Sequence, residues 1–169
     1  MPAYFHNPVA TCFGSGSLSR ISDLTAGQQV ALVTFPEARA LGLVDQVQTL
    51  LGERLCYVIE DVQPNPDVAQ LRTTYERFWA EAGDCHTVIA LGGGSAIDTA
   101  KALIVGTESG QFDELLQLLA LGQPFTPARS KALIAAPTTA GTGSEVTPWA
   151  TIWDSAAQKK YSLHLDCTW

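Results

Sequence analysis

The chain has 169 residues, of which 46% are apolar and 16% charged, as in an ordinary globular domain that can bury a core. Its formal net charge of -7 argues against a nucleic-acid surface, because phosphate binding needs clustered Lys and Arg, and no basic cluster exists beyond Lys159–Lys160. No apolar run approaches the roughly 20 residues of a membrane span, and the first residues lack the features of a secretory signal. We therefore predict a cytoplasmic protein without a nucleic-acid or membrane partner.

Cysteine and histidine spacings indicate neither a disulfide framework nor a metal site. The cysteines form no C-x-x-C pair and are scattered, as Cys12, Cys56, Cys85 and Cys167. We interpret them as reduced thiols of a cytosolic protein. The histidines show no ligand spacing either, and they lie at His6, His86 and His164.

Strand-like and helix-like segments alternate along most of the chain. The apolar run Gln29–Thr34 predicts a strand buried on both faces, and apolar residues at helical spacing predict a helix over Glu37–Leu51. A second strand is predicted at Leu55–Glu60. The prolines of Gln63–Asp67 then break the pattern, because proline cannot sit inside a ladder of strands. Asp67 is placed to cap a helix that carries Val68, Leu71, Tyr75, Phe78 and Ala82.

The same alternation continues through the second half of the chain. Strands are predicted at Thr87–Leu91 and Lys131–Pro137, and helices at Ser95–Val105 and Phe112–Leu121. Strands that are apolar on both faces and separated by long helices are typical of parallel sheets with helices on both sides. The sequence thus predicts an α/β fold with a doubly wound, mainly parallel, Rossmann-like sheet.

Both ends of the chain depart from this pattern. The first thirty residues are expected to form an edge hairpin. Near the other end, two short strands are predicted around a turn at Asp154–Gln158, and the chain stops at Trp169 straight after strand-like sequence. We expect residues 1–169 to be one domain, cut from a longer protein.

A glycine-rich turn, Gly92-Gly93-Gly94-Ser95, lies between a predicted strand and the helix that follows it. In open α/β sheets, ligands bind at the carboxyl ends of the strands. Bare glycines let a phosphate approach the backbone, and the N–H groups and dipole of the helix favour its negative charge. Ser95 can cap the helix and donate its hydroxyl, and Asp98 near the first turn suits the dipole. The alternative is a tight turn without a ligand.

A second loop, Pro137–Thr147, also follows a buried strand and is rich in glycine and hydroxyl groups. Two such loops at the carboxyl ends of strands would face each other across one crevice. That arrangement fits a dinucleotide with a pyrophosphate better than an isolated phosphate. Competing motifs fail, because no Gly-Lys pair completes a P-loop and Ile97 takes the place of the last glycine in a nucleophile elbow.

With both loops in view, the sequence resembles the N-terminal domain of the iron-containing (group III) alcohol dehydrogenases. The matching stretches run in order across nearly the whole chain. They are Phe13–Gly16, Pro64–Pro66, Gly92–Lys101, Pro137–Thr147 and Lys159–Ser162.

The resemblance implies a nicotinamide dinucleotide, NAD or NADP, bound beside the sheet. The residues that would hold its pyrophosphate and the nearby ribose are Gly93, Gly94, Ser95 and Asp98. Asn65 would approach the adenosine side, and Lys160 would bond a ribose hydroxyl. The nicotinamide half would be lined by Thr138, Thr139, Thr142 and Ser144.

Two departures from the family pattern matter. Many members place an acid beside the threonine after the first strand, where it binds the adenosine ribose; here Thr34 precedes Phe35 and Pro36. The choice between NAD and NADP is therefore open.

The catalytic metal of the family is held by one Asp and three His from a following helical domain, beyond Trp169. We expect no iron or zinc ligands and no catalytic residues in this chain.

The resemblance implies hydride transfer between a nicotinamide and a small primary or secondary alcohol or aldehyde in the full-length parent. This chain alone would be inactive. One alternative is a non-catalytic dinucleotide-binding or assembly module, a homodimer joined through its N-terminal edge strands. Another is a glycerol dehydrogenase or dehydroquinate synthase type of enzyme, which the sequence of Pro137–Thr147 fits less well.

Overall fold

A computed structural model of the chain describes residues 6–169. Its central sheet has four parallel strands in the order β2-β1-β3-β6. The strands are β1 (Val30–Thr34), β2 (Leu55–Ile59), β3 (Thr87–Gly92) and β6 (Ala132–Pro137). The predicted doubly wound, Rossmann-like sheet is therefore confirmed, with strand bounds close to those expected from the apolar runs.

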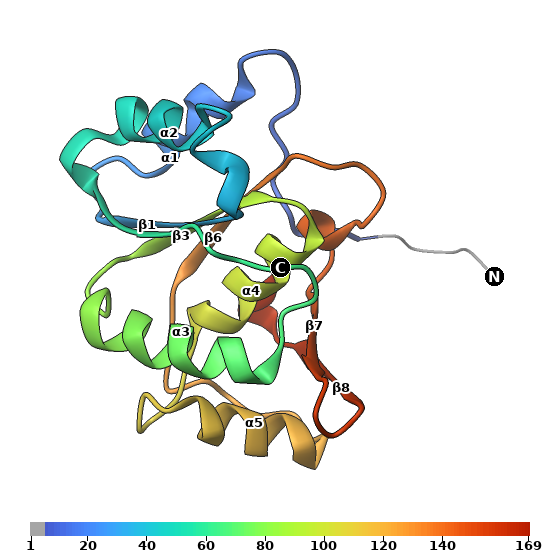
Figure 1. Cartoon of the computed structure of the whole chain (residues 1–169). Helices are drawn as coiled ribbons and strands as arrows, with labels where there is room; N and C mark the ends of the chain where they lie inside the picture. The colour runs from blue at the N-terminus through green and yellow to red at the C-terminus, as the bar shows by residue number, and fades with distance from the viewer. Residues whose placement is uncertain (1–5) are drawn as a thin grey trace.

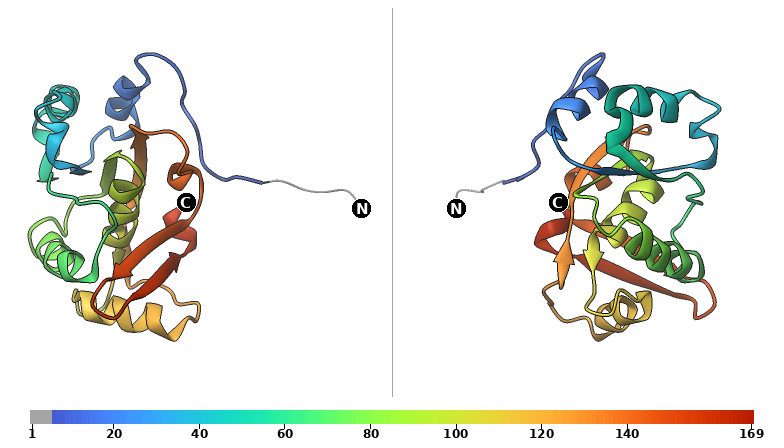
Figure 2. Two further views of the ribbon diagram at one scale, coloured as in Figure 1. Left: turned by 45° about the vertical axis from the view of Figure 1, so that its right-hand side comes forward. Right: turned by 90° about the vertical axis from the view of Figure 1, so that its left-hand side faces the viewer.

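Helices cover both faces of this sheet, as Figures 1 and 2 show. On one face lie α1 (Ile21–Leu24) and α2 (Leu43–Leu51), and on the other lie α3 (Val68–Glu81) and α4 (Gly94–Ile104). α5 (Phe112–Leu121) packs against α3 and has the predicted bounds. None of the helices in the part that the structure describes is long and apolar enough to cross a membrane.

The core is split into two clusters by the sheet. Along β1, Val30 and Leu32 join the cluster with α1 and α2, whereas Ala31 and Val33 join the cluster with α3, α4 and α5. Successive side chains of a strand point to opposite faces, so a strand covered by helices on both sides must be apolar throughout. This explains why β1 is buried at every position.

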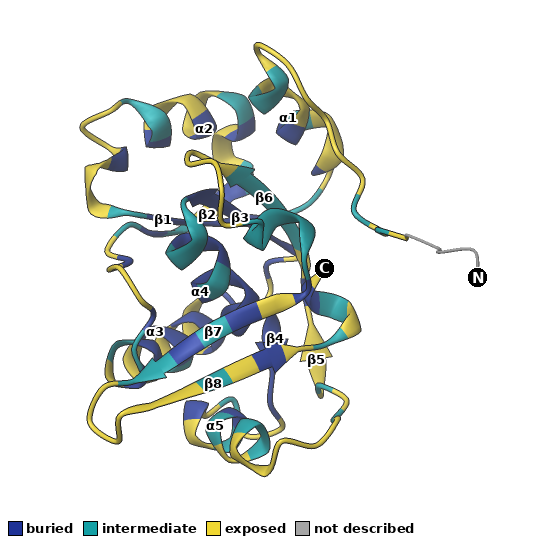
Figure 3. Cartoon of the chain, turned by 90° about the vertical axis from the view of Figure 1, so that its right-hand side faces the viewer, coloured by how far each residue is buried: buried dark blue, intermediate teal, exposed yellow. Residues whose placement is uncertain are grey.

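The end of the chain forms the predicted hairpin, made of β7 (Trp149–Asp154) and β8 (Lys159–His164). Figure 3 shows the hairpin lying across α4, with buried and exposed residues alternating along it. Its inner side adds Ala150, Ile152 and Leu163 to the core beside α4. A short antiparallel pair, β4 (Val105–Gly106) with β5 (Arg129–Ser130), was not anticipated from the sequence.

The expected N-terminal edge hairpin is wrong for the described residues 6–29, which contain no strand. Residues 1–5, the rest of that segment, lie outside the described residues. Gly14 and Gly16 have positive φ (130° and 78°) and turn the chain into a 3₁₀ helix, Ser17–Arg20, and then α1. The described part of this segment thus provides no edge strand for a dimer.

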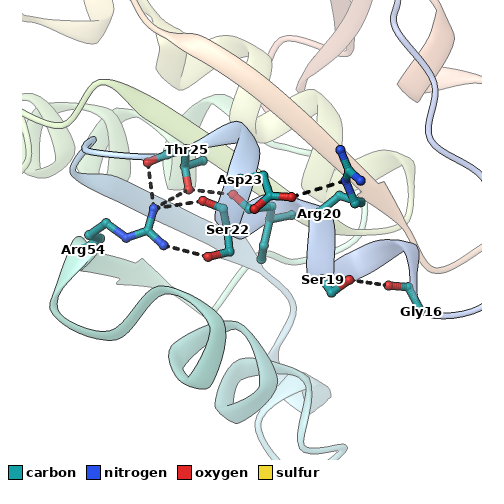
Figure 4. A network of polar contacts seen from close by, with 8 residues as sticks. Gly16, Ser19, Arg20, Ser22, Asp23, Thr25 and Arg54 are labelled. Atoms are coloured by element: carbon teal, nitrogen blue, oxygen red, sulfur yellow. Dashed lines mark hydrogen bonds and ion pairs between the residues drawn. The ribbon is translucent and has the colours of Figure 1, made fainter.

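Arg54 explains why α1 stays where it is. Its guanidinium donates to the backbone carbonyls of Ser22 (3.2 Å) and Thr25 (2.8 Å) and to the Ser22 hydroxyl (3.0 Å), as Figure 4 shows. These carbonyls belong to the last turn of the short helix, which lacks partners of its own. A cation at a helix C-terminus also suits the helix dipole.

The helix expected over Glu37–Leu51 begins later than predicted. A 3₁₀ turn, Pro36–Ala38, comes first, and α2 begins only at Leu43. Gly42 just before it has a φ of 73°, in the left-handed region that glycine tolerates best. Apolar residues thus recur at helical spacing on both sides of a turn that is not itself helical, so the predicted helix was too long at its N-terminal end.

Candidate functional site

The glycine turn lies where the connections of the sheet change direction. β1 has β2 on one side and β3 on the other, so the crossovers after β1 and β2 lead in opposite directions. Ligands of doubly wound folds bind outside the carboxyl ends of the strands at this point. Gly92 ends β3, and Gly93 and Gly94 lead directly into α4. The sequence-predicted turn is thus at the position that such ligands use.

The N-terminus of α4 is free of side-chain caps. Gly93 is its N-cap residue, its first turn carries no acid, and the N–H groups of Gly94 and Ser95 bond no acceptor in residues 6–169. The helices α2, α3 and α5 differ, because acids stand at or within their first turns, at Asp45, Asp67, Asp113 and Glu114. Unpaired N–H groups and the helix dipole make α4 suited to bind an anion.

Ser95 joins the turn to the loop after β2. The backbone N–H of Asn65 donates to Ser95 Oγ at 3.0 Å. Asn65 has a φ of 60°, a left-handed conformation that asparagine tolerates better than most residues. Because Ser95 Oγ accepts this bond, its own hydrogen stays available for a ligand oxygen. The structure therefore brings together Asn65 and Ser95, two predicted cofactor contacts 30 residues apart in the chain.

The second loop packs directly on the glycine turn. A Cβ built on Gly93 would lie 3.1 Å from Thr139 Oγ1, and one on Gly94 would lie 3.1 Å from Thr142 Cγ2 and 3.3 Å from Ser144 Oγ. The missing side chains therefore make room for this loop. Predicted contacts from two distant motifs meet here.

Hydroxyl groups are concentrated on this second loop. Thr138 donates its backbone N–H to Gly92 O at 3.0 Å, which extends the pairing of β3 and β6 by one residue. Thr138, Thr139 and Thr142 are exposed, and Ser144 is half-buried. The exposed threonines can offer donors and acceptors to a ligand beside the turn.

Asp98 is half-buried on α4 and points toward the hairpin. Its Oδ2 accepts the backbone N–H of Thr151 at 3.1 Å, whereas its Oδ1 is buried without a hydrogen-bond partner in the described chain. Burial raises the pKa of this carboxyl, and the Thr151 N–H, the Lys101 charge and the Ser144 hydroxyl oppose that shift. An ionised carboxylate accepts hydrogen bonds only, so Asp98 suits a ligand hydroxyl and repels phosphate oxygens.

Lys160 lies on β8 with its Nζ 3.9 Å from the centre of the Trp153 ring. These two residues are register partners across the hairpin. The backbone N–H of Trp153 donates to Pro66 O at 2.8 Å, so the hairpin end that carries Lys160 is tied to the Asn65 loop. Lys160 is exposed, and its ammonium is free to approach a ligand hydroxyl from this side.

Lys101 is the residue near the site to which the sequence interpretation assigned no role. It is buried, and its Nζ donates to backbone carbonyls of the second loop and of β7. A usable signal was present, since Lys101 stands in a helix segment whose neighbours Ala96, Ile97, Ala100 and Leu103 are apolar. A lysine among apolar residues of a buried helix must bond inside the protein.

The end of β1 bears on the choice of cofactor. The Thr34 hydroxyl donates to Leu91 O at 2.7 Å, and Phe35 lies 3.3 Å from where a Gly92 Cβ would be. The Thr34 hydroxyl hydrogen and the Phe35 ring are therefore both engaged in contacts within the protein. Beyond them, Arg39 forms an exposed ion pair with Glu60 at 2.9 Å.

Metal ligands were not expected in this chain. Across residues 6–169, the structure gathers no group of three or more His, Cys, Asp or Glu side chains that could hold a metal ion. The four cysteines are all free, and Cys85 is buried.

Comparison with known proteins identifies the family of this chain. Residues 8–168 match the family described as iron-containing alcohol dehydrogenase. The chain is 35% identical to a choline dehydrogenase of Bacillus subtilis and 34% identical to an NADPH-dependent butanol dehydrogenase of Clostridium saccharobutylicum, covering 94% and 89% of this chain. Its fold matches the crystal structure of a sulfoacetaldehyde reductase from Bifidobacterium kashiwanohense in complex with NAD+, with a TM-score of 0.84, 28% identity and 100% of this chain covered.

The chain spans less than half the length of these relatives. It covers 40% of the Bacillus enzyme, 39% of the clostridial enzyme and 44% of the chain in the Bifidobacterium structure. A further relative, an aldehyde-alcohol dehydrogenase of Streptococcus pneumoniae, is covered over 19% of its length. With the family match running over residues 8–168, the chain belongs to the iron-containing alcohol dehydrogenase family.

Proposed function

We propose that this chain is the cofactor-binding part of an NAD(P)-dependent alcohol dehydrogenase or aldehyde reductase. The uncapped N-terminus of α4 supports this most directly, because the unpaired N–H groups of Gly94 and Ser95 lie at the switch point of a Rossmann-like sheet. A pyrophosphate is the anion that a dinucleotide would present there. The NAD+ complex of the Bifidobacterium relative and the NADPH-dependent clostridial relative support the same ligand class.

Each predicted contact then takes a role that fits its chemistry. Gly93, Gly94 and Ser95 bind the pyrophosphate through backbone N–H groups and the Ser95 hydroxyl. Asn65 approaches the adenosine side, next to Ser95. Asp98 accepts a bond from a ribose hydroxyl, and Lys160 donates to one. The nicotinamide half lies along Thr138, Thr139, Thr142 and Ser144.

The reaction of the parent enzyme would be hydride transfer, for which the bound nicotinamide supplies the hydride carrier. The residues of this chain bind and orient that cofactor, so that one face of its ring is presented to the substrate. Because residues 6–169 bring no metal ligands together, we propose that the chain is inactive alone. The substrate is proposed only as a small primary or secondary alcohol or aldehyde.

Titration of the chain with NADH and, separately, NADPH tests this proposal. Nicotinamide fluorescence and isothermal calorimetry would follow binding, and we expect saturable binding of at least one cofactor. No binding of either at millimolar concentration would overturn the proposal and favour a structural or assembly module. A preference for one of the two would show whether the end of β1 accepts a 2′-phosphate. The matched control is ATP, which has phosphates but no nicotinamide.

We propose four further properties. The acidic net charge of -7 favours a chain without a nucleic-acid partner. We propose a cytoplasmic location and no membrane partner because the sequence has no long apolar run and its first residues lack the features of a secretory signal. A homodimer also stays a prediction, and size-exclusion chromatography with light scattering would test it.

A further inference from the structure

The buried ammonium of Lys101 binds three backbone carbonyls at once. Lys101 is 1% exposed, and its Nζ donates to Ser144 O at 2.7 Å, to Trp149 O at 3.0 Å and to Thr147 O. An ammonium has three donors, so this one is fully used. Peptide dipoles stabilise the charge at short range, since no carboxylate of the described residues lies within 4.0 Å of Nζ.

The three carbonyls belong to one continuous segment that leads from the second loop into the hairpin. Ser144 is in that loop, Thr147 ends it, and Trp149 begins β7. Lys101 itself lies in α4, two turns after the glycine turn. One side chain therefore links the helix that carries Gly94 and Ser95 to the segment that carries the proposed nicotinamide contacts. Bonds from a charged donor are about twice as strong as neutral ones.

We propose that Lys101 is a positioning residue that fixes the second loop against the glycine turn, so that the nicotinamide half of the dinucleotide meets a preformed surface. This role rests on the proposed function, because it concerns the same cofactor. Without the ammonium, the three carbonyls would lose their donor and the loop would lose its anchor to α4. Lys101 does not touch the cofactor in this proposal and acts through Ser144, Thr147 and Trp149.

Lys131 offers a matched control within the same chain. It is 8% exposed, and its Nζ donates to the carbonyls of Gly83 (2.7 Å) and Cys85 (2.6 Å). Lys131 stands before β6 at the amino end of the sheet, opposite the site. Burial lowers the pKa of both lysines, although Asp98 and Glu145 oppose this at Lys101 and Cys85 opposes it at Lys131. The carbonyls that Lys131 binds lie away from the site, and its Nζ also lies 4.5 Å from the centre of the Trp79 ring.

The test compares Lys101→Met with Lys131→Met, which both keep an unbranched side chain one atom shorter than lysine and remove its donors. Affinities for NADH and for ADP-ribose, which lacks the nicotinamide, would be measured together with the thermal unfolding midpoint. We expect Lys101→Met to weaken NADH binding about tenfold or more while ADP-ribose binding changes less than about twofold. Lys131→Met is expected to lower the midpoint and to leave both affinities unchanged.

Hydrogen exchange of the ligand-free protein gives a second readout that does not depend on the cofactor. We expect Lys101→Met to speed exchange of the amides in residues 138–149, and Lys131→Met to leave that segment unchanged. Unchanged NADH affinity and unchanged exchange in Lys101→Met would overturn the inference, as would an equal loss of NADH and ADP-ribose affinity. If the parent chain itself binds no dinucleotide, the proposed function fails, and the exchange result alone decides whether Lys101 holds the loop. Should Lys101→Met not fold, Lys101→Gln would be used in its place, because glutamine retains two N–H donors. The control would then be Lys131→Gln.

Discussion

The backbone N–H of Asn65 donates to the hydroxyl oxygen of Ser95 at 3.0 Å, which joins the loop after β2 to the first turn of α4. One serine thereby links the predicted adenosine side of the site to its predicted pyrophosphate side. The serine also keeps its own hydrogen for a ligand. Its loss should consequently affect binding more than folding.

Ser95→Ala should weaken NADH binding about tenfold and lower the unfolding midpoint by no more than about 3 °C, because one partly exposed hydrogen bond is worth roughly 1 kcal/mol. Calorimetric titration and a thermal melt would measure the two effects. Ser19→Ala is the control, since Ser19 Oγ also makes one bond to the backbone, which it donates to Gly16 O at 2.9 Å, on the exposed 3₁₀ helix before α1. Equal NADH affinity in Ser95→Ala and the parent would contradict the role of this hydroxyl.

Gly94→Ala should weaken dinucleotide binding by displacing the second loop. The added Cβ would lie 3.1 Å from Thr142 Cγ2, closer than ordinary contact, while the fold should persist because the neighbours are side chains of an exposed loop. Gly94→Val should have a larger effect in the same direction.

A second substitution separates this cause from others. Thr142→Ser removes the Cγ2 atom that the new Cβ would meet, so the double variant Gly94→Ala with Thr142→Ser should recover part of the lost NADH affinity. Non-additivity of this kind is expected for residues in contact. If the double variant binds as weakly as the sum of the two single effects requires, the loop contact is not the reason for the glycine.

Asp98 should make stability depend on pH. Burial raises the pKa of Asp98 above its unfolded value of about 4, so the native state holds its proton more tightly. The stability that this carboxyl contributes is therefore present below about pH 4 and is lost as pH rises through the raised pKa. Urea unfolding between pH 4 and pH 7 should show this component in the parent.

Asp98→Asn should lack this component, because the amide keeps an acceptor for the Thr151 N–H and carries no charge to desolvate. As pH rises, the unfolding free energy of Asp98→Asn should therefore increase relative to that of the parent. Asp61→Asn, at an exposed aspartate, serves as the control. Parallel pH profiles for the parent and Asp98→Asn would refute the assignment.

Asp67 should act in the opposite sense. Its carboxylate accepts the Ala69 N–H at 2.9 Å, which caps α3, and the Ser155 N–H at 3.0 Å, which ties the hairpin turn to that helix. The bonds from Ser155 and Ala69 lower the pKa of Asp67, so its contribution is present above about pH 4 and is lost as pH falls through the lowered pKa.

Asp67→Ala should cost about 1–2 kcal/mol of stability near pH 7, as removal of an N-cap does. Asp67→Asn should retain most of the stability, because its amide oxygen can still accept the capping bond. Urea unfolding of both variants at pH 7 would check this. Equal losses in the two variants would show that the charge, and not the cap, supplies the stability.

Local pattern was sufficient for most elements of the sheet and its helices. The runs at 30–34 and 87–91 are buried from both sides, which leaves little choice of side chain, so their apolar character alone indicates parallel strands. The run at 131–137 forms β6 as predicted, but contrary to its expected burial, residues 132–137 are half-buried or exposed at the edge of the sheet. The bounds of α5 and the cap at Asp67 followed from equally local signals. The glycine turn could be predicted in the same way, since an apolar strand-like run precedes it and residues with helical spacing follow it.

Tertiary context overrode local pattern in two places. The first thirty residues read as strands, but two glycines with positive φ turn the described part into short helices that Arg54 holds in place. Helical spacing from Glu37 onward hid the turn at Gly42. Neither outcome is recorded in hydrophobic periodicity, because both depend on glycines with positive φ.

The sequence by itself determined the α/β class, the family and the segments of the candidate site. Strands buried on two faces and glycine-rich turns can both be recognised from neighbouring residues alone. The tertiary structure alone decided that Gly93 and Gly94 are bare on the side facing Thr139 and Thr142, and that Lys101 bonds three carbonyls more than 40 residues away. Contacts of such separation depend on how α4, β6 and β7 pack together, and no local periodicity records that packing.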